Sequence, residues 1–161
     1  MRTPRVVDPR VCSIDAALKV IGEKWALLAL RELLLGSTRF DEIVSNTGAP
    51  RDRLSARLRA LEEAGVVRRE KYQERPVRYS YHLTEAGEQL FGLLQLMRDW
   101  GDRFVRDDPE YMAVFTHECG KPLRPELRCA ECGEVVQPGS VTTDRDVHQS
   151  DVVNAGRANG G

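Results

Sequence analysis

Two consecutive elements in the first half of the chain constrain its fold most. The segment 50–64 places three leucines at helical spacing on one side, with polar or small residues on the opposite side. Gly65 suits the left-handed backbone conformation that ends a helix. Residues 66–72 and 78–83 then have the pattern of short strands, the second strictly alternating, with 73–77 as the tip between them. This order predicts a helix-turn-helix unit followed by a β-wing.

Further helices are expected on both sides of this unit. Ser13 can cap a first helix, a second runs from 24 to 34 through the core, and Phe40 lies in a short third helix. Thr84 can cap a long last helix over 85–106. The predicted fold class is mainly α with a small antiparallel β wing (α+β), a winged helix-turn-helix, followed by a small Cys/His-rich appendage.

The expected last helix carries more apolar residues than its own core needs. These residues cover far more than the single stripe of a surface helix: Leu90, Phe91, Leu93, Leu94, Leu96, Met97, Trp100 and Phe104. A homodimer through the helix at 85–106 explains the surplus, because two-fold dimers dominate soluble oligomers. The alternative is that the C-terminal segment covers the extra surface.

Positive charge is concentrated in the predicted helix and wing. Residues 51–78 contain nine Arg and Lys side chains against five acidic ones, although the whole chain has a formal net charge of -1. Residues 1–107 carry 19 basic and 16 acidic side chains, whereas 108–161 carry 5 and 9. A cationic patch of this kind suits a polyanion, and double-stranded DNA is the expected partner.

The sequence disfavours an enzyme and a membrane protein. His82 and His148 have no plausible nucleophile or carboxylate pair near them, and no phosphate-binding glycine motif occurs, so no residue is assigned as catalytic. No apolar run approaches the roughly 18 to 20 residues of a membrane span, and the first ten residues lack a secretory core. We therefore expect a cytoplasmic protein, whose four cysteines are free, redox-sensing or metal-bound rather than paired in disulfides.

Several short motifs follow one another between residues 12 and 106. They are Cys12-Ser-Ile-Asp-Ala-Ala-Leu18, Ile21-Gly-Glu-Lys-Trp25, Arg39-Phe40, Leu58-Arg-Ala-Leu-Glu-Glu-Ala-Gly65, Tyr79-Ser-Tyr-His-Leu-Thr-Glu-Ala-Gly87 and Trp100-Gly101. Together they resemble the HxlR family of bacterial transcriptional regulators, a branch of the wider MarR-like winged-helix group. The resemblance implies a homodimer that binds operator DNA and represses or activates nearby genes. We expect a repressor that binds a palindromic operator.

The chain is expected to divide into four segments. Residues 12–107 form an HxlR-type winged-helix domain for DNA binding and dimerisation, preceded by a flexible arm over 1–11. A zinc-ribbon-like segment over 108–138 follows, and then a disordered tail over 139–161.

By the same resemblance, the helix that begins near Pro50 is the recognition helix in the DNA major groove. The residues expected at base edges or nearby phosphates are Arg51, Asp52, Arg53, Ser55 and Ala56. A second set is expected to bind the DNA backbone, which fixes register without reading sequence: Arg39, Arg59, Arg75 and Arg78.

Two questions about these residues stay open in the sequence. Asp52 either accepts a hydrogen bond from a cytosine amine or orients a neighbouring arginine, Arg51 or Arg53, and we favour orientation. Any one arginine is also open to a plainer interpretation as a solvated surface charge, paired with an acidic neighbour such as Glu62, Glu63 or Glu70.

Cys12 is a candidate redox sensor. It stands near the start of the first expected helix, where the helix dipole favours a reactive thiolate, and some members of the family that the chain resembles sense oxidants at the matching position. The alternative is a small buried apolar residue. The effector, whether a small molecule or an oxidant, is not identified by the sequence.

The other three cysteines lie in a metal-binding pattern. The first half is His117-x-Cys119-Gly120, and the second half is Cys129-x-x-Cys132-Gly133. Nine residues, 120–128, separate Cys119 from Cys129. The second half is typical of a zinc knuckle, whereas the first half has a tighter spacing than an ordinary zinc ribbon. We expect one structural zinc bound by His117, Cys119, Cys129 and Cys132, with no open position for catalysis. The alternatives are a thiol pair that has lost its metal and a dithiol redox switch.

A second function remains open at this point. The chain is alternatively a redox- or metal-sensing interaction module that uses its winged helix to contact another protein. Salt separates the two functions, because DNA binding weakens steeply with ionic strength and an apolar protein interface does not.

Overall fold

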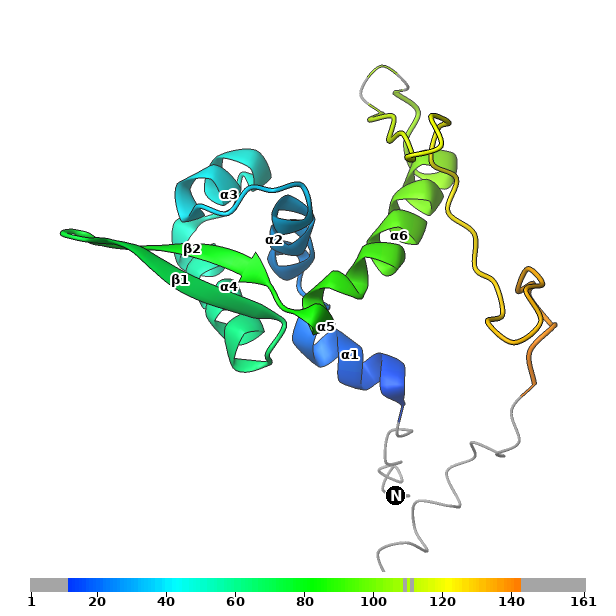
Figure 1. The fold of residues 1–161 in the computed structure, drawn as a ribbon, viewed down its shortest axis with the longest axis horizontal. Coiled ribbons are helices and arrows are strands. Elements are labelled where there is room, and N and C mark those ends of the chain that lie inside the picture. Colours follow the sequence, from blue (N-terminus) through cyan, green and yellow to red (C-terminus); the bar gives the residue numbers. More distant parts are fainter. Residues whose placement is uncertain (1–11, 109, 111, 143–161) are drawn as a thin grey trace, which may run out of the picture.

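The computed structural model describes residues 12–108, 110 and 112–142. Four helices come first: α1 (Ser13–Ile21), α2 (Lys24–Leu34), α3 (Phe40–Thr47) and α4 (Arg51–Glu63). The antiparallel strands β1 (Val67–Glu74) and β2 (Val77–Leu83) follow, and then α5 (Glu85–Glu88) and α6 (Leu90–Phe104). Figure 1 shows α2, α3 and α4 gathered in one body, with the two strands leaving it as a narrow ribbon and α6 leaving on another side. The α+β winged-helix class is confirmed.

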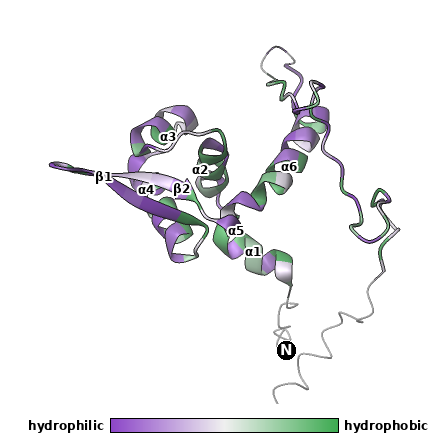
Figure 2. Ribbon diagram, viewed as in Figure 1, coloured by the Kyte–Doolittle hydropathy of each residue, from purple (hydrophilic) through white to green (hydrophobic). Residues whose placement is uncertain are grey.

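A cluster of apolar side chains holds α2, α3 and α4 together. Leu30 on α2 and Ile43 on α3 are fully buried against the leucine stripe of α4. That stripe, Leu54, Leu58 and Leu61, is itself fully buried, as its helical spacing predicts. Burying a side chain of this size contributes about 1.5–3 kcal/mol. In Figure 2, α2 is accordingly one of the most hydrophobic elements of the chain.

The connection from α4 to the wing is a glycine turn. Gly65 has φ of +72°, and the amide of Val66 donates to the carbonyl of Leu61 at 2.9 Å. This geometry confirms Gly65 as the helix terminator. The strands reach further than predicted, since β1 runs to Glu74 and β2 starts at Val77. A bulge at Tyr72 shifts the register and allows pairing to continue to the tip.

The expected alternation of buried and exposed residues in β2 is only partly found. All residues from Tyr79 to Leu83 are half-buried. The segment before α3 runs along the free edge of the strand: the amide of Tyr81 donates to the carbonyl of Thr38 at 2.8 Å, and Arg39 forms a β-bridge with Ser80. The wing is therefore fixed to the helical body along this edge.

The predicted single helix over 85–106 is wrong in two respects. The helix is interrupted at Gln89, and it ends at Phe104. Thr84 does cap the first part, since its hydroxyl oxygen accepts from the amide of Gly87 at 3.3 Å. Gly87 is buried, and a Cβ there would lie 2.3 Å from the carbonyl oxygen of Val66. This close approach anchors α5 to the body, whereas α6 turns away from it.

Two predicted helix starts are shifted by one residue. Cys12, not Ser13, is the N-cap of α1, and its side chain makes no capping hydrogen bond. Pro50 is likewise the N-cap of α4 rather than a residue of its first turn. Pro50 suits this place because its fixed φ precedes the helix without requiring an amide donor.

The described part of the C-terminal segment contains short turns and isolated bridges. Thr116 pairs with Pro122, and Arg128 pairs with Val135. The predicted arm over 1–11 and residues 143–161 of the predicted tail lie outside the described residues, and the segment boundaries stay predictions. Among the residues that the structure describes, no helix has the length and apolar character of a membrane span.

Candidate nucleic-acid interface

The side of α4 that faces away from the core carries the predicted base-reading residues. The stripe of leucines anchors the helix and leaves the opposite side open to solvent. The residues of α4 predicted to contact DNA are all exposed: Arg51, Asp52, Arg53, Ser55, Ala56 and Arg59. Arg57 differs from them, because it is half-buried and lies 3.7 Å from the carboxylate of Glu23. The helix therefore presents a polar, mainly cationic surface.

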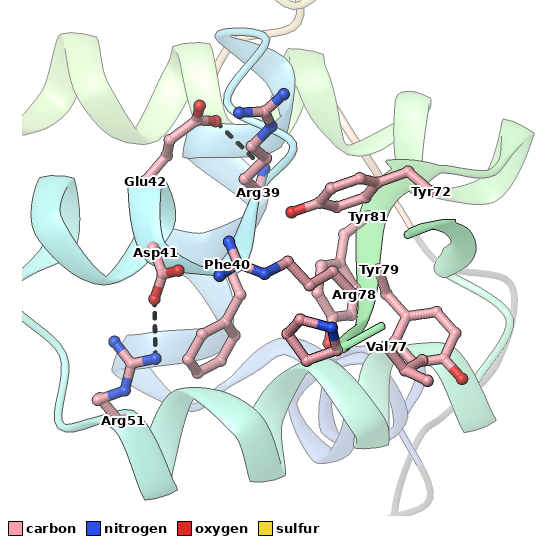
Figure 3. Close-up of a pocket in the computed structure, with 11 residues that line it drawn as sticks. Arg39, Phe40, Asp41, Glu42, Arg51, Tyr72, Val77, Arg78, Tyr79 and Tyr81 are labelled. Atoms are coloured by element: carbon pink, nitrogen blue, oxygen red, sulfur yellow. Dashed lines mark hydrogen bonds and ion pairs between the residues drawn. The ribbon is translucent and has the colours of Figure 1, made fainter. Parts of the chain in front are cut away.

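Arg51 is held by α3. Its guanidinium lies 2.8 Å from the carboxylate of Asp41 and 5.0 Å from the ring centre of Phe40 (Figure 3). Asp41 therefore holds Arg51, whereas the expected role of Asp52, to orient Arg51 or Arg53, stays a prediction. No local pattern predicts this pair, because ten residues and a turn separate its members. Both side chains remain about two-thirds exposed, so the ion pair is weak and exchangeable.

The start of α3, the start of α4 and the wing line one concave surface with a volume of about 550 Å³. Arg39 approaches it from the edge of α3, with its guanidinium 5.4 Å from the ring centre of Tyr72. Arg78 approaches it from β2 (Figure 3). The structure thus brings Arg39, Arg51 and Arg78 together, although they are far apart in the sequence. Asp41 and Glu42 lie beside them and reduce the net positive charge.

Ion pairs separate the arginines into two groups. Arg57, Arg68 and Arg69 are paired with acidic side chains of their own chain, Glu23, Glu70 and Glu62 respectively. For these three the plainer interpretation as paired surface charges holds. Within the described residues, five of the predicted DNA contacts have no acidic partner within ion-pair distance: Arg39, Arg53, Arg59, Arg75 and Arg78. These five guanidinium groups are free to meet DNA.

Aromatic residues of the wing complete the surface, and the sequence analysis did not select them. Tyr72 and Tyr79 stack against Arg39 and Arg69. Burial raises the pKa of the Tyr81 hydroxyl above its ordinary value. The alternation of tyrosine with arginine in 68–81 was the signal that could have identified them.

A family model described as HxlR-like helix-turn-helix matches residues 20–109. This match covers more than half of the chain, and it spans the whole surface described above. The chain belongs to the HxlR-like helix-turn-helix family. The resemblance of its motifs to this family is thereby confirmed.

Relatives in Mycobacterium and Bacillus support the assignment. The HTH-type transcriptional regulator Rv3095 of Mycobacterium tuberculosis (strain ATCC 25618 / H37Rv) is 40% identical over 133 residues, which are 82% of this chain and 84% of the relative. The HTH-type transcriptional regulator YdeP of Bacillus subtilis (strain 168) is 36% identical over 94 residues, 58% of this chain and 73% of the relative. This HxlR-family protein is a transcriptional regulator of the helix-turn-helix type and not an enzyme.

Two similar solved structures are also regulators. PA1607, proposed to be a transcription factor, has a TM-score of 0.73 and 31% identity, with 84% of this chain and 95% of that chain covered. The redox regulator HypR in its oxidised form has a TM-score of 0.54 and 35% identity, with 60% and 99% covered. The match to PA1607 extends beyond the winged helix into the C-terminal part of this HxlR-family chain.

The predicted zinc ligands lie in two glycine turns. In the first, the amide of Cys119 donates to His117 Nδ1 at 3.2 Å, and Gly120 has φ of +79°. In the second, hydrogen bonds to the Cys129 sulfur from the amides of Cys132 and Glu131, and from the Cys132 thiol, lower the pKa of Cys129.

Each turn has the form of half a zinc knuckle. However, no three His, Cys, Asp or Glu side chains come together as a metal site within the described range. The four residues therefore do not form one site in this structure. A structural zinc stays a prediction, and no step of the mechanism depends on it.

Cys12 lies at the junction of the N-terminal arm and α1. It is half-buried, and its carbonyl accepts from the amide of Ala16 at 3.0 Å. Its position at the N-cap agrees with the environment that the sequence predicts for a reactive thiol. Its role as a sensor is not established by this position.

Proposed function

We propose that this HxlR-family regulator is a repressor that binds a palindromic operator as a homodimer. The observation that carries the proposal is the exposed polar side of α4, flanked by Arg39 and Arg78. The leucine stripe fixes α4 at the surface, so its first turns can enter the major groove of B-DNA. The wing, fixed to the body at Thr38, reaches along the neighbouring backbone.

Within this proposal the residues divide into two roles. Base edges are contacted by Arg51, Asp52, Arg53, Ser55 and Ala56. An arginine that contacts a guanine with both nitrogens contributes about 1–3 kcal/mol of discrimination. Phosphates are contacted by Arg39, Arg59, Arg75 and Arg78, which set register. Arg51 exchanges its exposed pair with Asp41 for a base or a phosphate.

The apolar surface of α1 and α6 supports the homodimer. Trp100 is 59% exposed and Phe104 is 71% exposed on α6, and Ile14 is 69% exposed on α1. Leu18 and Met97 line an apolar groove of about 340 Å³ between these helices. A second copy related by a two-fold axis covers this surface and presents two recognition helices to half-sites about 34 Å apart.

Two regulatory inputs fit this arrangement. Cys12 caps α1 beside the apolar groove, so oxidation of its thiol would add bulk or a cross-link next to the dimer surface. HypR, which resembles this chain, is described as a redox regulator. We therefore propose Cys12 as a sensor. A small-molecule effector is the second input.

The test is genome-wide mapping of the DNA sites of the full-length protein and of two variants. Arg53→Ala removes an unpaired arginine from the exposed side of α4, whereas Arg57→Ala is the matched control, because Arg57 lies beside Glu23. The proposal requires a two-fold symmetric site that is enriched by the wild type and the control and lost in Arg53→Ala. Equal enrichment by all three proteins would reject Arg53 as a reader.

The alternative function, an interaction module that contacts another protein, has a distinct outcome in the same experiment. It requires no enriched DNA site, and its complex with a protein should persist at high salt, where phosphate contacts weaken. The cationic side of α4 favours DNA, because arginine side chains neutralise the phosphates of the duplex.

A further inference from the structure

A cleft with a volume of about 650 Å³ lies between α2, α6 and the segment 112–115. It does not belong to the surface that faces DNA, and it adjoins the groove between α1 and α6, with which it shares Leu27 and Met97. Its wall is mainly apolar, with Leu28 from α2, Phe91 and Leu94 from α6, and Phe115 from the C-terminal segment. A volume of this size is in the range of small-molecule sites in proteins.

Two polar atoms in the wall of this cleft have no partner. Within the described residues, Gln95 Oε1 and Arg98 Nε are the buried side-chain nitrogen or oxygen atoms without a hydrogen bond. Gln95 is only 8% exposed, and both side chains line the cleft. Leaving such an atom buried and unpaired is costly, so each one requires an explanation, such as a bound group that pairs with it.

The chemistry of these two atoms defines what satisfies them. Gln95 Oε1 accepts a hydrogen bond and Arg98 Nε donates one. The residues are three apart on α6, so they lie on the same side of the helix. A single hydroxyl group can donate to Gln95 and accept from Arg98 at the same time.

The charged groups around the cleft largely compensate one another, so they do not favour an ionic ligand. Glu32 is paired with Arg31 at 2.7 Å, and its second oxygen accepts from Asn46 at 2.8 Å. Arg106 is paired with Asp108 at 2.6 Å. Arg98 and Asp102 then remain as one cation and one anion. The net charge of the lining is therefore small once the ion pairs are counted.

We infer that this cleft binds a small apolar molecule that carries a hydroxyl group, an alcohol or a phenol. The apolar body contacts Leu28, Phe91 and Phe115, and the hydroxyl bridges Gln95 Oε1 and Arg98 Nε. Both atoms are shielded from water in the empty cleft, so the ligand reaches them after rotation of the Gln95 and Arg98 side chains. The Arg98 guanidinium lies 4.2 Å from the ring centre of Phe115, and this contact breaks when the Arg98 side chain rotates.

The position of the cleft gives binding a consequence for regulation. One wall is α2, part of the body that carries α4, and the other wall is α6, which carries the proposed dimer surface. A ligand between α2 and α6 alters the angle between the body that carries α4 and the helix α6. This consequence rests on the proposed function, whereas binding itself does not.

The experiment is a calorimetric titration of the full-length protein with two probes, 2-naphthol and 2-methoxynaphthalene. The two have the same apolar ring system, but only 2-naphthol can donate a hydrogen bond. We expect one site per chain and a preference for 2-naphthol of about threefold to tenfold, which is the effect of one net hydrogen bond. Gln95→Leu should abolish the preference, because it removes the acceptor.

Matched variants separate this effect from a general disturbance of α6. Arg98→Met should weaken both probes, since both accept from Arg98, whereas Arg103→Met removes an exposed arginine of the same helix and should change neither. Ala113→Trp blocks the cleft from its exposed side and should weaken both probes at least about tenfold. If Gln95→Leu or Arg98→Met does not fold, Ala113→Trp still tests whether the probes bind in this cleft.

Three results would overturn the inference. They are no saturable binding of either probe, a preference for 2-naphthol that survives Gln95→Leu, and binding that is unchanged in Ala113→Trp. Because no DNA is present, these results leave the proposed function untouched. Failure of operator binding likewise leaves this inference standing.

Discussion

The salt dependence of DNA binding tests how many arginines contact phosphates. Four arginines per chain are assigned to phosphates, Arg39, Arg59, Arg75 and Arg78, and none of them has an acidic partner in the described residues. If each meets one phosphate, a dimer makes about eight contacts, and log K falls with log salt with a slope of about −7. The affinity then falls about 10⁴-fold between about 50 and about 200 mM salt.

Arg59→Ala should change this slope by a defined amount. It removes two contacts per dimer, so the slope should shrink to about −5 and the loss over the same salt range to about 10³-fold. Arg57→Ala should keep the slope of the wild type, because Arg57 already lies beside Glu23. The assay is fluorescence anisotropy of a labelled operator at five salt concentrations. Equal slopes for Arg59→Ala and the wild type would refute the assignment of Arg59 to a phosphate.

Four further predictions concern the dimer, the metal, the thiols and the backbone. Trp100→Glu should convert the dimer into a monomer in analytical ultracentrifugation, since it places a charge in the exposed apolar surface of α6. The purified protein should contain about one zinc per chain by elemental analysis, and Cys132→Ser should lose most of it. In metal-free protein, alkylation of Cys129 should reach its plateau below the pH usual for a thiol, because its pKa is lowered and the thiolate persists at lower pH. Gly65→Ala should lower the free energy of unfolding by about 1 kcal/mol, since φ is +72° at this residue. Gly92→Ala should raise the free energy of unfolding by about 0.5–1 kcal/mol, because Gly92 lies in a helix with open space around it. Thermal unfolding measures both changes.

Each of these predictions has an outcome that contradicts it. A Trp100→Glu protein that still sediments as a dimer would place the interface elsewhere. Zinc near zero after purification without chelators would remove the metal site. An alkylation profile of Cys129 with the usual thiol midpoint would contradict the hydrogen bonds to its sulfur. Changes of the same sign at Gly65 and Gly92 would contradict the backbone argument.

Features set by local chemistry were predictable from the sequence. The leucine stripe of α4 follows from its spacing, and all three side chains are fully buried. Gly65 as a helix terminator and Thr84 as a cap follow from the preferences of single residues. The cationic patch was predictable as well, because charge clusters can be counted along the chain.

Features set by contacts between distant segments were not predictable. The pairing of Arg51 with Asp41 depends on the packing of α3 against α4. The close approach of Gly87 to Val66, next to the break at Gln89, is likewise a contact between distant segments that no helical period encodes. The cleft beside α6 forms only where α2 and the C-terminal segment meet it. The motif of the C-terminal segment was recognisable, but its spacing did not reveal that the two turns stay apart.

The edge contact between the loop before α3 and β2 limits how this regulator can release DNA. The backbone bond from Tyr81 to Thr38 and the bridge between Arg39 and Ser80 join the ribbon to the helices that support α4. The ribbon and α4 are therefore supported by the same unit. Under the proposed function, we expect an effector to move both together, so that each half-site is vacated in a single step.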